Sequence, residues 1–366
     1  MRIFSPIVEP SDLRAQFPVL ERIVYLNAGT DGPLPGAAVR AARTELEREL
    51  ADGRAMAHFE RRTELTDALR VAYATALGGC EPADVALTTC TTEGLAHVIG
   101  GLDLKAGDEI VTSDEEHPGL LGPLSAAREL HGVTVREVPL AQVAEAVGPK
   151  TVLVTCSHVG WVSGSYAPVE LADVEVPVLL DGAQGIGAVD IDLKALGCDA
   201  YAGAGQKWMC GPDGTGAFYV SEALREQLSV PRRAYTNLEN ANAGLEAEVR
   251  GDARRFDAAS MNAESVACSL AAAAVLESFG WTALRARART LAARLSEMLA
   301  DSGREVAPRG ETTLVSWVSA DAEGERERLA AQGVVIRNLP DRPLLRASVG
   351  AWNDDSDLER LLAALD

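Results

Sequence analysis

The sequence contains no apolar run near 18 residues, the length that a membrane-spanning helix needs. Its first residues also lack a basic stretch followed by an apolar core, so we expect no secretory signal. The six cysteines are scattered, and none belongs to a CxxC or CxxH pair. This spacing argues against a disulfide framework and a structural zinc site. We therefore expect no bound metal and a reducing, cytoplasmic location.

Positive charge is also scarce. The chain has 34 Lys and Arg residues against 54 Asp and Glu residues, which gives a formal net charge of −20. This excess of negative charge disfavours nucleic acid and anionic membranes as partners. An anionic small molecule must then be held by local groups rather than by the overall field.

What the chain does have is length. Its 366 residues exceed what one hydrophobic core usually supports, which favours two lobes. Short β-branched segments, such as 151–155 and 176–180, alternate with helical patterns and predict a three-layer αβα domain with a mainly parallel sheet. We place this large domain at residues 21–262 and a small α+β domain at residues 263–366. We expect residues 1–20 to pack against the small domain.

Several stretches that follow predicted strands carry residues suited to chemistry, and ligands of open parallel sheets bind beyond the carboxyl ends of the strands. Thr91 and Thr92 precede a predicted helix, a pattern typical of an anion site or of simple helix capping. His117, in Glu-His-Pro-Gly, could stack on an aromatic ring, transfer a proton or do neither. Asp181 directly follows the apolar strand 176–180, where its carboxylate either meets a cationic or N–H partner or caps a helix.

Lys207 lies among glycines and other small residues in the stretch 199–216, with no other charged residue within five positions. Glycines let the backbone approach a flat ligand, and partial burial lowers the pKa of an amine so that it can act as nucleophile or base. The alternative is a glycine-rich turn with an incidental lysine. An anion clamp, an imidazole, a carboxylate and an amine together fit pyridoxal phosphate.

On these motifs the chain resembles the class V aminotransferase family of fold-type I pyridoxal-phosphate enzymes, from about Tyr25 to Leu362. The resemblance implies that Lys207 is the Schiff-base lysine, and that Asp181 pairs with the pyridine nitrogen. It also implies contacts to the ring hydroxyl, the ring face and the phosphate. These contacts would come from Gln184 for the hydroxyl, His117 for the ring face, and Thr91, Thr92 and Gln206 for the phosphate.

The resemblance further implies a homodimer with its sites at the interface, where Ser260 matches a threonine that reaches the phosphate of the partner. Arg346 matches the arginine that binds the carboxylate of an amino-acid substrate. Arg337 matches a second such arginine in the cystine and cysteine-conjugate C–S lyases, although it could also be a surface strand residue. Further residues that resemble this subgroup, and that we expect to line the substrate site, are Gly29, Thr30 and Trp161.

Three positions depart from the family pattern. The family usually has histidine where this chain has Gln206, and often serine or threonine where it has Ala204; both usually help to hold the phosphate. Residues 338–345 contain no cysteine, whereas one group of cysteine desulfurases carries its persulfide-forming cysteine there. Sulfur transfer requires such a nucleophile, so this absence argues against it.

These observations lead us to expect a β-eliminating C–S lyase. Its substrate would be cysteine, cystine or a cysteine S-conjugate, and its products pyruvate, ammonia and a thiol or persulfide. The alternatives are an aminotransferase or epimerase of an amino acid or amino-group-bearing metabolite, an oxygen-using or decarboxylating enzyme, and a non-enzymatic relative. The fold by itself does not decide among them.

Overall fold

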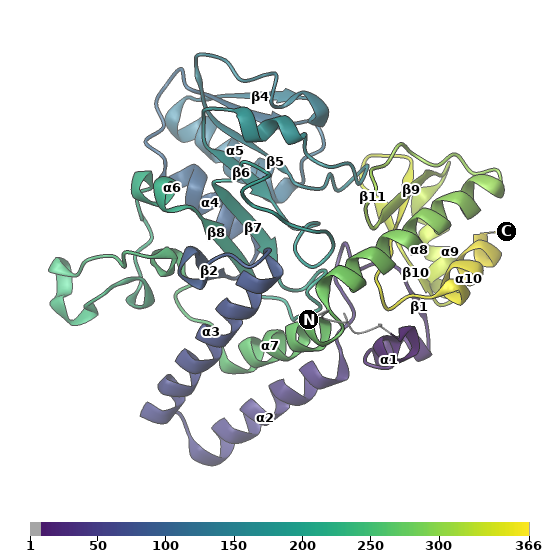
Figure 1. Cartoon of the computed structure of the whole chain (residues 1–366), viewed down its shortest axis with the longest axis horizontal. Helices are drawn as coiled ribbons and strands as arrows, with labels where there is room; N and C mark the ends of the chain where they lie inside the picture. Colours follow the sequence, from purple (N-terminus) through teal and green to yellow (C-terminus); the bar gives the residue numbers. More distant parts are fainter. Residues whose placement is uncertain (1–8, 366) are drawn as a thin grey trace, which may run out of the picture.

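The computed structural model describes residues 9–365, which form a large and a small lobe (Figure 1). The large lobe is built on a seven-stranded sheet with the order β2-β8-β7-β6-β5-β3-β4. Among these strands, β8 alone runs in the direction opposite to the others. The carboxyl ends of the others therefore meet at one edge of the sheet. The strands are β2 (Val85–Thr88), β3 (Glu109–Ser113), β4 (Thr134–Val138), β5 (Thr151–Ser157), β6 (Val178–Asp181), β7 (Ala200–Ala204) and β8 (Gly216–Val220).

Helices cover both faces of this sheet because its central strands are buried on both sides. On one face, α3 (Met56–Ala76) and α7 (Ala263–Ser278) pack with Leu180 of β6. On the other face, α4 (Thr91–Gly101) and α5 (Pro118–His131) pack with Leu179 of the same strand. Alternate residues of one strand thus serve two cores. The predicted three-layer α/β domain with a mainly parallel sheet is confirmed.

In the part of the chain that the structure describes, the small lobe holds two small sheets and three helices. Its antiparallel sheet has the order β11-β12-β9, and β1 pairs in parallel with β10. The core of this lobe is centred on the fully buried Trp317 and Leu345. The elements are β1 (Val24–Tyr25), α8 (Trp281–Asp301), β9 (Leu314–Val318), α9 (Ala322–Ala331), β10 (Val334–Val335), β11 (Arg337–Leu339), β12 (Leu344–Ser348) and α10 (Asp355–Leu365).

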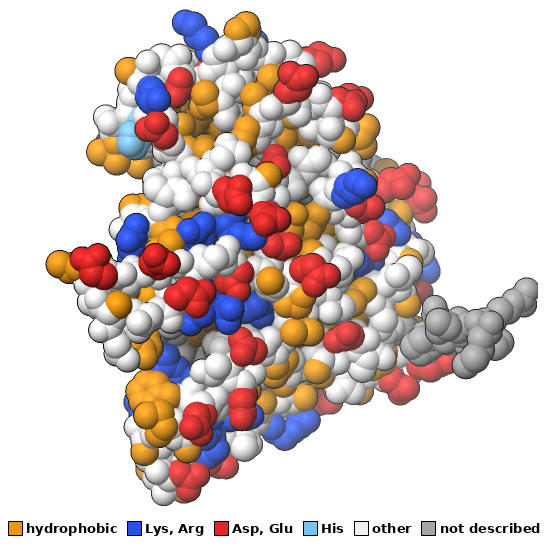
Figure 2. Space-filling model, turned by 60° about the vertical axis from the view of Figure 1, so that its left-hand side comes forward, with side chains coloured by type: hydrophobic (Ala, Val, Ile, Leu, Met, Phe, Trp, Pro, Cys, Tyr) orange, Lys and Arg blue, Asp and Glu red, His pale blue; other side chains and the backbone are white. Residues whose placement is uncertain are grey.

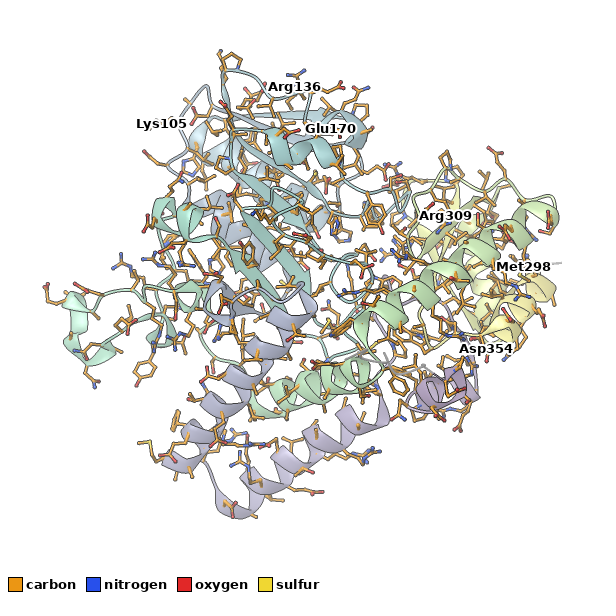
Figure 3. The ribbon with its side chains drawn as sticks, viewed as in Figure 1. Lys105, Arg136, Glu170, Met298, Arg309 and Asp354 are labelled. Carbon is orange, nitrogen blue, oxygen red and sulfur yellow. The ribbon has the colours of Figure 1, made fainter. Side chains whose placement is uncertain are left out.

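The beginning of the described chain lies against the small lobe. Helix α1 (Pro10–Arg14) places Arg14 within 2.7 Å of Asp357 and 3.4 Å of Asp354, and Figure 3 shows Asp354 beside this helix. These ion pairs join α1 to the start of α10. Residues 1–8 of the predicted N-terminal segment lie outside the described residues.

The two lobes are joined through α7 and α8, which meet at 80°. Helix α7 packs into the core of the large lobe, whereas α8 packs with the small one. The domain boundary at residue 262 stays a prediction; by packing alone, α7 belongs with the sheet. No single helix within residues 9–365 has the length and apolarity to span a membrane. The bent pair α7–α8 has that length and apolarity only when its two helices are taken together.

Candidate active site

The sequence-predicted residues gather at the sheet edge where the parallel strands end. Asp181 is the last residue of β6, and Lys207 lies in the turn after β7. His117 caps the N-terminus of α5, which follows β3, and Thr91 begins α4, which follows β2. This arrangement follows from topology, since connections from parallel strands leave at the same edge.

Lys207 is half-buried in a turn that leaves little room around its backbone. Gly32 donates its N–H to the Gln206 carbonyl at 2.7 Å, and a Cβ on Gly32 would lie 2.0 Å from the Lys207 carbonyl oxygen. Burial lowers the pKa of Lys207 to about 8; Asp181 opposes this shift, while Arg346 and Arg337 reinforce it. A substantial fraction of the amine is therefore uncharged near neutral pH, as a nucleophile or base requires.

Asp181 is buried and faces this amine without forming an ion pair to it within the described chain. One of its carboxyl oxygens accepts the Ala183 N–H at 2.9 Å. Burial raises the pKa of Asp181, and the positive charge of Lys207 opposes that rise. The turn after Asp181 rests on Tyr201, whose ring would lie 1.9 Å from a Cβ on Gly182. Glycine is therefore required at 182 for the turn to sit where it does.

Gln184 joins two loops that border the site. Its amide nitrogen donates to the Gly29 carbonyl at 2.7 Å, and its amide oxygen accepts the Trp208 indole N–H at 2.9 Å. The contact to a ring hydroxyl that sequence predicts for Gln184 stays a prediction, and one amide N–H remains for it. The structure adds a second role, because this side chain anchors the Gly29 loop beside the turn that carries Lys207.

The imidazole of His117 is held in one orientation and uncharged. Its Nδ1 accepts the Gly119 N–H at 3.0 Å, and its ring meets the Trp161 ring edge-on, with centroids 5.2 Å apart. Burial lowers the pKa of His117 to about 4, with further lowering by the charges of Lys207 and two arginines. A neutral, fixed ring at this place suits stacking better than proton donation.

Two arginines from the small lobe face this edge of the large lobe. Arg337 on β11 and Arg346 on β12 are directly paired in register. Arg346 is fully buried, donates to the Trp161 carbonyl at 2.6 Å, and leaves Nε and Nη2 without a partner among the described residues. Burial and the charge of Arg337 lower the pKa of Arg346 to about 9. A buried guanidinium with free N–H groups indicates a site for a carboxylate.

The remaining substrate-side predictions fall next to these arginines. Arg337 donates to the Thr30 hydroxyl at 3.3 Å and lies 5.8 Å from the centre of the Trp161 ring. A Cβ on Gly29 would lie 3.0 Å from Nη2 of Arg346. Gly29, Thr30, Trp161, Arg337 and Arg346 are thus brought together, although they come from widely separated parts of the sequence.

Thr91 and Thr92 open helix α4. The Thr91 hydroxyl is buried without a partner in the described chain, and the Thr92 hydroxyl would lie 2.7 Å from a Cβ on Gly119, close to His117. The amide oxygen of Gln206 is likewise buried and unpartnered. A free hydroxyl at a helix N-terminus, as on Thr91, is typical of an anion site, whereas the Gln206 amide oxygen is an acceptor and does not contribute to one.

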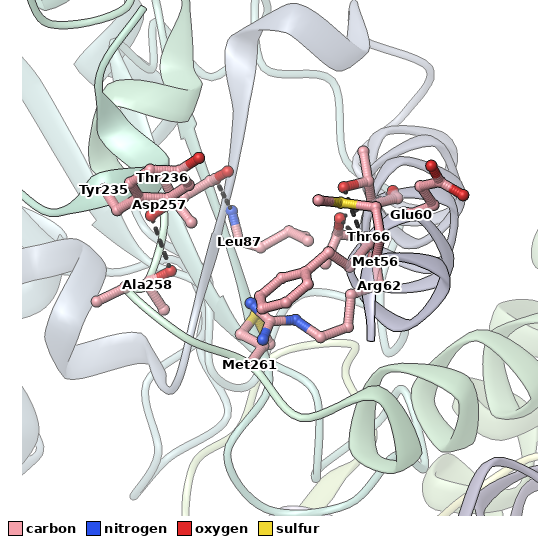
Figure 4. A pocket seen from close by; sticks show the side chains of 13 residues that line it. Met56, Glu60, Arg62, Thr66, Leu87, Tyr235, Thr236, Asp257, Ala258 and Met261 are labelled. Carbon is pink, nitrogen blue, oxygen red and sulfur yellow. Dashed lines mark hydrogen bonds between the residues drawn. The ribbon is translucent and has the colours of Figure 1, made fainter. Parts of the chain in front are cut away.

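Ser260 is not part of this cluster in the single chain. It is exposed in the loop before α7, next to a cavity of about 660 Å³ between α3 and the segment 235–261 (Figure 4). Met56, Tyr235 and Met261 are among the residues that line this cavity. The role predicted for Ser260 requires a partner chain and stays a prediction.

Sequence reasoning missed Glu116, which lies beneath the site. Its carboxyl group is buried and receives hydrogen bonds from the Ser113 hydroxyl, from the Ser157 N–H at 2.9 Å and from the Ser157 hydroxyl at 2.7 Å. Burial raises the pKa of Glu116 to about 7. The only signal in the sequence was the position of Glu116 beside His117. The serine partners of Glu116 end two different strands, so no local pattern predicts these hydrogen bonds.

The aminotransferase class-V family model matches residues 23–361. The chain belongs to this family. An isopenicillin N epimerase of Streptomyces clavuligerus is 29% identical over 94% of each chain, and a probable cysteine desulfurase of Pseudomonas aeruginosa is 29% identical over 98% of each. The predicted family is therefore confirmed.

Solved structures of this family are similar along nearly the whole chain. The cystine C–S lyase C-DES, in complex with its reaction product cysteine persulfide, superposes with a TM-score of 0.89. It is 28% identical, with 96% of this chain and 99% of that chain covered. Another C-DES structure has glycine covalently linked to its pyridoxal-phosphate cofactor. The class-V aminotransferase fold and a pyridoxal-phosphate-dependent enzyme, both predicted from sequence, are confirmed.

The residues at the sheet edge fit this cofactor. The Lys207 amine and the buried Asp181 carboxyl face each other without an ion pair among the described residues, and unpartnered Thr91 lies at a helix N-terminus. Lys207 would bind the aldehyde carbon, Asp181 the pyridine nitrogen, and Thr91 with Thr92 the phosphate. The fixed ring of His117 would cover one face of the pyridine.

Proposed function

We propose that this class-V aminotransferase family member is a β-eliminating C–S lyase acting on cysteine, cystine or a cysteine S-conjugate. The observation that carries the proposal is the buried guanidinium of Arg346, with two unpartnered nitrogens, in a site that also holds Lys207. It suits the carboxylate of an α-amino acid. The sulfur chemistry is supported by the likeness to C-DES, whose substrate is cystine.

Bound pyridoxal phosphate would supply an acceptor for the electrons released when the substrate Cα–H bond breaks. Arg346, assisted by Arg337, would hold the substrate carboxylate and so fix the orientation of Cα. The Lys207 amine, whose pKa burial lowers to about 8, would take the Cα proton. The Cβ–S bond would then break with its electron pair on sulfur, and water would convert the remaining three-carbon unit to pyruvate and ammonia.

Release of sulfur in the product, rather than its transfer to the enzyme, is supported by the surroundings of the two arginines. Strands β11 and β12 are joined by a short turn, since Leu339 pairs with Leu344, and this turn carries no cysteine. Cys210, three residues after Lys207, is fully buried, and burial raises the pKa of its thiol well above the usual value. Such a thiol is a poor nucleophile.

Epimerisation is the second candidate, because two relatives that match 94% or more of this chain are isopenicillin N epimerases. Inversion at Cα requires a proton donor on the face opposite the base. His117 is uncharged over most of the pH range, with a pKa near 4, and its Nδ1 accepts from Gly119. An imidazole that is seldom protonated is a poor proton donor, which supports elimination over epimerisation.

The test is an assay of purified protein with cystine and with an S-conjugate of cysteine, in the absence of any keto acid. Elimination yields pyruvate and ammonia in equal amounts, and Lys207→Ala yields neither. Turnover that requires an added keto acid would instead establish an aminotransferase. Loss of optical purity in the remaining substrate without pyruvate would establish an epimerase.

A further inference from the structure

The first turn of α4 contains a negative charge where an anion is expected to bind. Glu93, two residues after Thr91, folds back so that its carboxylate accepts the Thr89 N–H at 2.6 Å and the Thr89 hydroxyl at 2.7 Å. Thr91, only 8% exposed, leaves its hydroxyl unpartnered in the described chain. A phosphate dianion at this turn would be repelled by Glu93 unless a cation lies close by.

The neighbouring strand does not supply that cation. A Cβ on Gly94 would lie 2.8 Å from the Cβ of Ala202, so the first turn of α4 rests directly on β7. The residues that follow along β7 and its turn are uncharged up to Lys207, and they include Ala204 and Gln206. Lys207 itself is expected to be occupied by the aldehyde end of the cofactor.

Arg232 provides a cation at this place. Its Nη2 forms an ion pair with Oε1 of Glu93, and the side chain is 62% exposed. It lies at the base of a segment, residues 231–250, that projects at the left of Figure 1 after α6 (Glu222–Gln227). Figure 2 brings this face forward and shows basic side chains interspersed with acidic ones rather than a continuous basic surface.

We infer that Arg232 supplies the positive charge of the subsite for the cofactor's phosphate, neutralising Glu93 and attracting the dianion to the first turn of α4. The inference concerns cofactor binding alone and holds whichever reaction the enzyme catalyses. Its failure is therefore distinguishable from failure of the proposed lyase activity.

The experiment compares pyridoxal phosphate with pyridoxal, which carries the same aldehyde and ring but no phosphate. Apo-protein is titrated with each compound, and binding is followed by absorbance of the bound chromophore. The variants are Arg232→Ala, Arg232→Glu and Glu93→Gln. Arg233→Ala is the matched control, because Arg233 is also exposed but donates to the Val230 carbonyl at 3.4 Å. Thermal unfolding of each apo-variant checks that the fold is unchanged.

Arg232→Ala is expected to weaken pyridoxal phosphate binding about tenfold or more, equivalent to about 1.4 kcal/mol, and to leave pyridoxal binding unchanged. Arg232→Glu should bind pyridoxal phosphate more weakly still. The double variant that combines Glu93→Gln with Arg232→Ala should regain part of the affinity that Arg232→Ala loses. Wild-type affinity for pyridoxal phosphate in Arg232→Ala would overturn the inference. An equal loss for pyridoxal, or an equal effect of Arg233→Ala, would overturn it too.

Discussion

At Lys207, opposing influences set the protonation of the amine. Burial and two arginines lower the pKa of Lys207 to about 8, and the carboxylate of Asp181 opposes this decrease. The neutral amine is the form that reacts with an aldehyde. The amine must therefore lose its proton before the cofactor binds covalently.

The first prediction follows for the apo-enzyme. The rate of pyridoxal-phosphate uptake should rise about tenfold per pH unit below about pH 8 and level off above it, since only the fraction of neutral amine changes. Stopped-flow absorbance between about pH 6 and 9 measures this. Asp181→Asn should move the midpoint to lower pH, because the carboxylate that favours the charged amine is gone. A rate independent of pH would contradict the predicted role of Lys207.

Arg346 is the second residue-scale test. Arg346→Lys keeps the charge but loses the planar pair of N–H donors, so kcat/KM for the amino-acid substrate should fall about 10- to 100-fold. Arg342→Lys, in the exposed turn between β11 and β12, is the control and should stay near wild type. Equal kinetics for Arg346→Lys and wild type would show that the carboxylate binds elsewhere.

At the scale of elements, Glu116 joins the ends of β3 and β5. It accepts from Ser113 of one strand and Ser157 of the other, and Ser157 pairs in register with Asp181. The carboxyl group therefore stiffens the edge that positions Asp181. Because burial raises the pKa of Glu116 to about 7, the stability that it contributes depends on pH.

The sign of that linkage gives a third prediction. An unfolded glutamate titrates near pH 4.3, so between about pH 4 and 7 the unfolded chain loses this proton while the folded chain keeps it. Stability contributed by Glu116 therefore falls as pH rises through that window and is constant above it. The stability of wild type relative to Glu116→Gln should decline by at most about 4 kcal/mol across the window. Urea unfolding at pH 5 and pH 8 tests this, and an unchanged difference would refute it.

The turn after β6 gives a fourth prediction. Gly182→Ala places a methyl group 1.9 Å from the buried Tyr201 ring, so it should destabilise the protein by about 1–3 kcal/mol and displace Asp181. Gly122→Ala, within α5, meets nothing within 4 Å and should be neutral or stabilising by up to about 1 kcal/mol. Thermal unfolding of the two variants compares them directly. Equal melting temperatures would mean that the turn can shift at no cost.

At the scale of the whole molecule, the sequence predicted what depends on local pattern. Short β-branched strands and the residues just beyond them predicted the layered fold and placed Asp181, Lys207 and Thr91 at one edge, because topology alone brings strand ends together. The sequence did not predict the hydrogen-bond partners of Gln184 or Glu116. Those contacts join loops and strands that are distant in sequence, and no local pattern records them.

The homodimer predicted by resemblance is a further whole-molecule test. Light scattering of purified protein should give a mass about twice the 38.6 kDa of one chain. Ser260→Ala should then weaken cofactor binding without changing the mass, since the exposed Ser260 would reach the partner's phosphate. A monomer at micromolar concentration that binds the cofactor tightly would contradict both parts of this prediction.

The parallel pairing of β1 with β10 has a consequence for synthesis on the ribosome. The loop that carries Gly29 and Thr30 follows β1, and β1 has its neighbour only once Val334 and Val335 have been made. Arg14 likewise waits for Asp357, 343 residues further along the chain. The sheet of the large lobe can form earlier. Nascent chains should therefore form the sheet edge that carries Lys207 first, and position the loop with Gly29 and Thr30 last.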